Sequence, residues 1–140
     1  MFRKILVAHD GSEGAQKAMA VAIDLASRYG AELHLISVIE ELPKYAATID
    51  EVEGVKAQAI QHYEAIQQEA SRQAERRGVK AYDQIVPGHE VQTIVEYAEQ
   101  GGFDLLVVGR HGHSARWLKH LGSTSSQITF RAPCTVMVVA

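Results

Sequence analysis

Three short segments hold residues whose types and spacing suit the binding of a phosphorylated ligand. Residues 9–12 read His-Asp-Gly-Ser, which places a carboxylate beside a glycine turn, and residues 109–114 read Gly-Arg-His-Gly-His-Ser. Residues 122–126 read Gly-Ser-Thr-Ser-Ser and add four consecutive hydroxyls. Glycine lets a ligand approach the backbone closely, and the free amides at a helix start attract phosphate. The three segments predict a phosphate-binding site if the fold brings them together.

Each of these segments also has a purely structural interpretation. A glycine after a strand usually forms a turn, and Ser12 and Ser123 are good helix caps. The carboxylate of Asp10 can accept hydrogen bonds from backbone N–H groups of its own turn. His111 and His113 have the chemistry of metal ligands, but two ligands without a third make a poor metal site. We therefore predict no metal site.

Five apolar runs predict the strands that position these segments. They lie at residues 5–8, 33–38, 81–86, 105–108 and 135–139. The first, fourth and fifth are continuous, as parallel strands covered on both faces usually are, whereas the more polar third run suits a sheet edge. Apolar residues at helical spacing lie between them at 15–29, 52–74 and 91–98, and a short fourth helix fits between Gly122 and Pro133.

This alternation of strands and helices predicts a doubly wound, Rossmann-like α/β fold. We expect an open five-stranded parallel sheet with strand order 3-2-1-4-5 and helices on both faces. The whole chain, residues 1–140, is expected to form one domain. Ligands of such sheets bind at the carboxyl ends of the strands, where the winding reverses. The three segments are therefore predicted to line one crevice.

Composition excludes several other classes of protein. The formal net charge is −3 and Lys and Arg are spread along the chain, so we expect no nucleic-acid partner. No apolar run approaches a signal peptide or a membrane span of roughly 18 residues, and the single Cys134 fits a reducing compartment. We expect a cytoplasmic protein with no membrane partner. A P-loop NTPase is excluded because no Gly-x-x-x-x-Gly-Lys-Ser/Thr sequence is present.

The ordered motifs resemble those of the ATP-binding universal stress proteins. Gly-x-x-Gly at residues 109–112, nine further residues and Gly-Ser at 122–123 match the nucleotide motif of that family. Residues 5–12 and 132–139 are similar to its first strand and turn and to its last strand. The resemblance covers essentially the whole chain and implies an adenine nucleotide alpha hydrolase-like fold.

By this resemblance an adenine nucleotide, ATP or else AMP or ADP, lies between the first and fourth strands, with any Mg²⁺ held through its phosphates. Asp10 is expected to contact the ribose or the adenine edge, and the backbone at Val38 to hold the adenine. The glycines of the motif would line the ribose and phosphate path, and the start of the last helix would hold the phosphates. The complete expected set is Ala8, Asp10, Val38, Gly109, Arg110, Gly112, Gly122, Ser123 and Thr124.

The function implied by the resemblance is that of a nucleotide-responsive regulatory protein of the stress response, with an unknown protein partner. A slow ATPase or self-phosphorylating enzyme is one alternative. Since no nucleophile is paired with an oriented base, we predict no catalytic residue and at most slow turnover. A nucleotide-free interaction protein is the other alternative.

The last strand predicts a homodimer. Residues 136–139 are all apolar, no charged residue follows Arg131, and the expected strand order places this strand at the sheet edge. An uncharged, β-branched edge strand is a template for pairing, and two copies can pair about a two-fold axis. Universal stress proteins are similar in dimerising through this strand. A monomer is the alternative if helices or a loop cover the edge.

Overall fold

Strands and helices alternate along the part of the chain that the computed structural model describes, which comprises residues 1–40, 49–110 and 123–140. Their bounds are β1 Lys4–Ala8, α1 Glu13–Tyr29, β2 Glu32–Ile39, α2 Ile49–Arg76, β3 Ala81–Pro87, α3 Glu90–Gln100, β4 Leu105–Gly109, α4 Ser123–Arg131 and β5 Thr135–Val139. Gly112, Gly122, His111 and His113 lie outside the described residues. None of the helices in the described ranges is long and apolar enough to cross a membrane.

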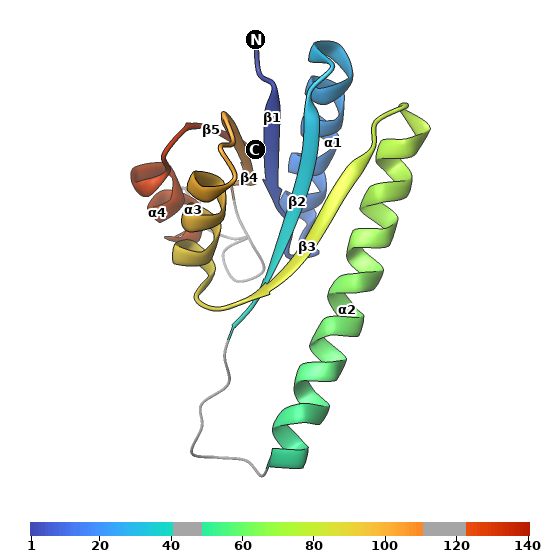
Figure 1. The fold of residues 1–140 in the computed structure, drawn as a ribbon, viewed down its shortest axis with the longest axis vertical. Coiled ribbons are helices and arrows are strands. Elements are labelled where there is room, and N and C mark those ends of the chain that lie inside the picture. Colours follow the sequence, from blue (N-terminus) through green and yellow to red (C-terminus); the bar gives the residue numbers. More distant parts are fainter. Residues whose placement is uncertain (41–48, 111–122) are drawn as a thin grey trace.

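The five strands form one parallel sheet in the order β3-β2-β1-β4-β5 (Figure 1). This order confirms the doubly wound fold predicted from the sequence. From the central strand β1 the chain winds outward to β3, then crosses back and winds outward from β4 to β5. The winding therefore reverses between β1 and β4, whose carboxyl ends frame the expected ligand crevice.

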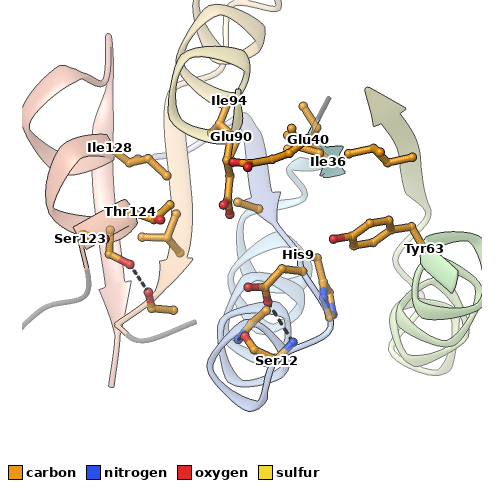
Figure 2. Close-up of a pocket in the computed structure, with 18 of the residues that line it drawn as sticks. His9, Ser12, Ile36, Glu40, Tyr63, Glu90, Ile94, Ser123, Thr124 and Ile128 are labelled. Atoms are coloured by element: carbon orange, nitrogen blue, oxygen red, sulfur yellow. Dashed lines mark hydrogen bonds between the residues drawn. The ribbon is translucent and has the colours of Figure 1, made fainter. Parts of the chain in front are cut away.

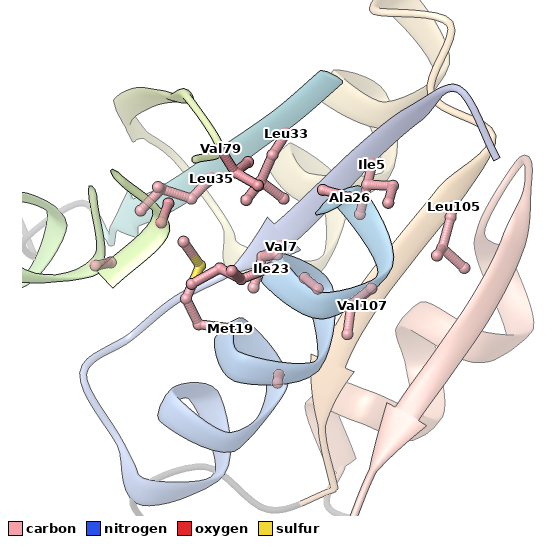
Figure 3. Packing of buried hydrophobic residues seen from close by; sticks show 14 residues of the cluster. Ile5, Val7, Met19, Ile23, Ala26, Leu33, Leu35, Val79, Leu105 and Val107 are labelled. Carbon is pink, nitrogen blue, oxygen red and sulfur yellow. The ribbon is translucent and has the colours of Figure 1, made fainter. Parts of the chain in front are cut away.

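Helices cover both faces of the sheet because successive side chains of each central strand point to opposite sides. On one face α1 and α2 pack over Val7, Leu35 and Val107, which are fully buried (Figure 3). On the other face α3 and α4 pack over Leu6 and Leu106, which are also fully buried. This double burial explains the continuous apolar runs of β1 and β4. The polar third run is the edge strand β3, as expected.

The ends of α1 lie where the sequence predicts them. The Ser12 hydroxyl caps its first turn by accepting the Ala15 N–H at 3.1 Å, and Gly30 ends the helix with a left-handed φ of 63°. Helix α2 begins at Ile49, earlier than the apolar pattern from Val52 indicates. Apolar spacing marks only the packed part of a helix, and α2 extends beyond that part.

Candidate functional site

A cavity of about 410 Å³ lies at the carboxyl ends of β1, β2 and β4, where the winding of the sheet reverses (Figure 2). Its walls come from the turn after β1, the ends of β2 and β4, the middle of α2, and the first turns of α3 and α4. These parts are far apart in the sequence, and the topology of the sheet brings them together.

Most of the predicted binding residues line this cavity. The residues that do so are Ala8, Asp10, Val38, Gly109, Ser123 and Thr124. Arg110 is exposed and is not among the lining residues, and its backbone N–H donates to the carbonyl oxygen of Val139 at 2.8 Å. Gly112 and Gly122 lie outside the described residues. The turn after β1 and the start of α4 thus share one cavity.

The turn after β1 is held by its own hydrogen bonds. The Ser12 N–H donates to Asp10 Oδ1 at 2.9 Å, and the Gly11 N–H donates to His9 Nδ1 at 3.1 Å. Gly11 has a φ of 84°, which favours glycine. Asp10 and Ser12 therefore both have the structural roles that the sequence left open, and both also line the cavity.

His9 is a buried, neutral imidazole at the base of this turn. His9 is only 5% exposed, and this burial lowers the pKa of its imidazole below the ordinary value of 6.5. The negative charge of Asp10 raises the pKa, but its effect is smaller than that of burial. Since Nδ1 accepts the Gly11 N–H, the single ring proton lies on Nε2. Protonation of Nδ1 would replace this hydrogen bond by a repulsive contact between two donors.

We expect the stability of the protein to fall between about pH 7.5 and pH 5.5 in part because of His9. In the unfolded state His9 binds a proton near pH 6.5, whereas in the folded state it binds the proton only at lower pH. The free energy of unfolding therefore decreases as the pH falls through about 6.5. Urea unfolding at both pH values measures the decrease. His9→Asn keeps an acceptor for Gly11 but does not titrate, so its pH dependence should be smaller. An equal pH dependence in both proteins would contradict the assignment.

An acidic wall with a tyrosine faces the turn after β1. Tyr63 of α2 points its hydroxyl into the cavity, and Glu40 and Glu90 lie at the end of β2 and the start of α3 (Figure 2). Burial raises the pKa of Tyr63, and the negative charges of Asp10, Glu90 and Glu40 raise it further. No Lys or Arg of the described residues lines the cavity. This side of the cavity is therefore anionic.

The sequence did not identify this acidic wall, although it held part of the signal. Glu40 directly follows the second strand and Glu90 begins the third helix, both at the strand ends where ligands bind. Tyr63 had no such signal, because its position depends on where α2 crosses the sheet.

The hydroxyls at the start of α4 divide into two groups. Ser123 and Thr124 line the cavity, whereas Ser125 is buried and donates to the Gly109 carbonyl at 2.5 Å. Ser126 is exposed and does not line the cavity. Successive helical residues point about 100° apart, so four hydroxyls in a row cannot all face one ligand. Ser125 instead fixes α4 to the end of β4.

Gly109 lines the cavity, but its lack of a side chain has another cause. A Cβ at this position would lie 2.5 Å from the carbonyl carbon and 2.7 Å from the carbonyl oxygen of Gly14. The first turn of α1 therefore packs directly on Gly109. The close approach of these two backbones requires glycine whether or not a ligand is present.

The fold and the cavity define a doubly wound α/β protein with a cavity at its switch point. A family model described as "Universal stress protein family" matches residues 1–140, and the chain belongs to this family. The Thermus aquaticus protein called "Universal stress protein in QAH/OAS sulfhydrylase 3'region" is 33% identical over 140 residues, covering 99% of each chain. The solved universal stress protein UspA from Lactobacillus plantarum has a TM-score of 0.91 and 26% identity, covering 99% of this chain and 98% of that one.

Other solved structures with this fold contain nucleotides. A universal stress protein in complex with cAMP has a TM-score of 0.76 and 24% identity, covering 99% of this chain and 97% of that one. The Archaeoglobus fulgidus protein in complex with dAMP has a TM-score of 0.71 and 20% identity, covering 99% and 98%. An Arabidopsis thaliana protein with AMP bound has a TM-score of 0.69 and 16% identity, covering 98% and 90%. At these identities the likeness shows the shared fold alone.

Proposed function

We propose that this chain binds an adenine nucleotide, as ATP, ADP or AMP, in the cavity between β1 and β4. The observation that carries the proposal is that the Asp10 carboxylate, the Val38 end of β2 and the hydroxyls of Ser123 and Thr124 line one cavity. Its volume of about 410 Å³ lies within the range of about 300–1,000 Å³ that is typical of small-molecule sites.

The chemistry of the walls supports one orientation of the nucleotide. Asp10 accepts hydrogen bonds from ribose hydroxyls, and the backbone at Val38 bonds the adenine edge. Isoleucines of β2, α3 and α4 provide apolar surface for the base. The phosphates point to Ser123 and Thr124 at the start of α4, away from the acidic wall, and hold any Mg²⁺.

The nucleotide-bound neighbours support adenine as the base. They contain cAMP, dAMP and AMP, which differ in the sugar and phosphate but share the base. We propose that binding rather than turnover is the activity of the protein. In this proposal a single cytoplasmic domain changes its affinity for a protein partner of the stress response when the nucleotide binds.

We also propose that the protein is a homodimer paired through β5. Among the strands of the described residues, β5 lies at the edge of the sheet and pairs only with β4. Residues Val136 to Val139 are partly exposed, and Phe130 of the adjacent α4 is 91% exposed. An apolar edge strand beside an exposed aromatic ring is typical of an interface.

Loss of the Asp10 carboxylate is expected to weaken nucleotide binding by about 1–3 kcal/mol, or about 5- to 150-fold, because ribose hydroxyls would lose their acceptor. Calorimetric titration of Asp10→Ala and wild type with ATP, ADP and AMP in the presence of Mg²⁺ measures the change. Glu75→Ala, which removes an exposed carboxylate from the end of α2, should bind as wild type does.

Two results would contradict the proposed function. Wild type that binds none of the three nucleotides would favour a nucleotide-free interaction protein. Equal affinity of Asp10→Ala and wild type would place the nucleotide elsewhere. Mass spectrometry of any small molecule released when the purified protein is denatured would identify the nucleotide independently.

A further inference from the structure

A chain of hydrogen bonds joins α2 to β2, to the middle of β3 and to the residue that follows β1, and its bonds through Ser37 are buried. Gln67 of α2 is only 3% exposed, and its Nε2 donates to Ser37 Oγ at 3.1 Å and to the Gln84 carbonyl at 2.8 Å. Ser37 is 1% exposed and donates to the His9 carbonyl at 2.7 Å. We refer to these four residues as the Gln67 relay.

The buried apolar residues of α2 that follow Gln67 on the packed face are small. Ala70 and Ala74 are 2% and 0% exposed, so methyl groups line this part of the contact with the sheet. Hydrogen bonds are directional, so the relay defines a position along the sheet that these alanines alone specify weakly. A shift of α2 by one turn, about 5.4 Å, would leave the Gln84 carbonyl without its partner.

The relay lies directly behind the ligand cavity. Tyr63 precedes Gln67 by one helical turn, so both side chains project from the same face of α2, and Tyr63 forms part of the cavity wall. At the other end of the relay, His9 begins the turn that carries Asp10. A Cβ at Gly11 of that turn would lie 2.6 Å from Ile66 Cδ1 of α2. The position of α2 therefore sets both Tyr63 and the turn with Asp10.

We propose that Gln67, acting through Ser37, is a positioning residue that holds Tyr63 and the turn after β1 in the geometry that binds the nucleotide. The inference rests on the proposed function and extends it to residues that do not line the ligand cavity. Because coupling is reciprocal, a bound nucleotide in turn holds α2 in place. The position of α2, and with it the exposed outer face of this helix, then depends on whether a nucleotide occupies the cavity.

Gln67→Met tests this proposal, because methionine has a similar length but donates no hydrogen bond. We expect a folded protein whose affinity for AMP is about tenfold lower. Gln68→Met is the matched control, since Gln68 is the next residue of the same helix and is exposed. It should bind AMP as wild type does. Ser37→Ala should also weaken binding, and the double variant should lose no more affinity than the weaker-binding single variant, because both changes break one relay.

Two further measurements separate positioning from a general loss of stability. The NMR signals of the Tyr63 ring, assigned with Tyr63→Phe, should shift in ligand-free Gln67→Met and stay in place in Gln68→Met. AMP should slow hydrogen exchange of amides in residues 59–67 of wild type, and much less so in Gln67→Met at the same fractional saturation. Unchanged AMP affinity together with an unmoved Tyr63 signal in folded Gln67→Met would overturn the proposal.

The proposal remains testable if Gln67→Met does not fold or if wild type does not bind AMP. If Gln67→Met does not fold, Ser37→Ala is tested alone, because this variant retains the hydrogen bond from Gln67 to Gln84. A Ser37→Ala protein with wild-type affinity for AMP and an unmoved Tyr63 signal would overturn the proposal. If wild type does not bind AMP, the proposed function fails for that ligand. The Tyr63 signals of the ligand-free variants then still support or refute the positioning role, so the two failures are distinguishable.

Discussion

Replacing Gly109 with alanine is expected to lower the free energy of unfolding by about 1–3 kcal/mol, because the new Cβ would lie 2.5 Å from the carbonyl carbon of Gly14. The conflicting atoms belong to the backbone of α1 and cannot turn aside as a flexible side chain would. Helix α1 must move away from β4, which opens the packing of the sheet centre. Urea unfolding followed by circular dichroism measures the loss.

Gly54→Ala is the matched control for this prediction. Gly54 lies in the exposed part of α2, and a Cβ there would meet no atom of the described residues within 4 Å. Alanine should therefore stabilise the helix by about 0.5–1 kcal/mol, the opposite direction to Gly109→Ala. If Gly109→Ala were as stable as wild type but bound no nucleotide, the glycine would serve the ligand instead of the fold.

Val138→Pro is expected to convert the proposed dimer entirely to monomer. The Val139 carbonyl accepts the Arg110 N–H and so points toward β4. The N–H and C=O groups of successive residues in a strand alternate in direction, so those of Val138 point away from β4. Proline at this position removes an edge donor and leaves the ladder to β4 intact. Light scattering behind a sizing column should report about 15.4 kDa for the variant and about twice that mass for wild type.

Val138→Thr is the control for this change, because it keeps the N–H and the β-branched shape. It should remain dimeric. Circular dichroism must show that Val138→Pro retains the fold. A monomeric wild type at tens of micromolar would refute the dimer, and a folded Val138→Pro that stays dimeric would place the interface away from the β5 edge.

The sheet could be predicted from the sequence because each strand is marked by a pattern of a few consecutive residues. The runs of β1 and β4 are apolar on both faces, and polar residues begin where these strands end, so strand positions and the crevice between them followed from pattern alone. Asp10 was predicted as a binding residue for the same reason: it directly follows a strand, and strand ends converge at one edge of the sheet.

The residues that the sequence missed depend on contacts between distant elements. Tyr63 reaches the cavity only because α2 crosses the sheet at one particular place, and no local pattern states where. Gly109 resembled a ligand-binding glycine, but its contact with Gly14 joins two elements that are far apart in the chain. Gln67 did have a readable signal, since it lies between Tyr63 and Ala70 at helical spacing on an otherwise apolar face.

The walls of the cavity come from both halves of the chain, from the turn after β1 to the first turns of α4. During synthesis the first strand, α1 and β2 leave the ribosome long before α4 does. A growing chain therefore carries Asp10 but has no complete pocket until α4 has emerged. A ligand of this cavity therefore cannot assist folding steps that precede the synthesis of α4, and it stabilises only chains in which α4 is already present.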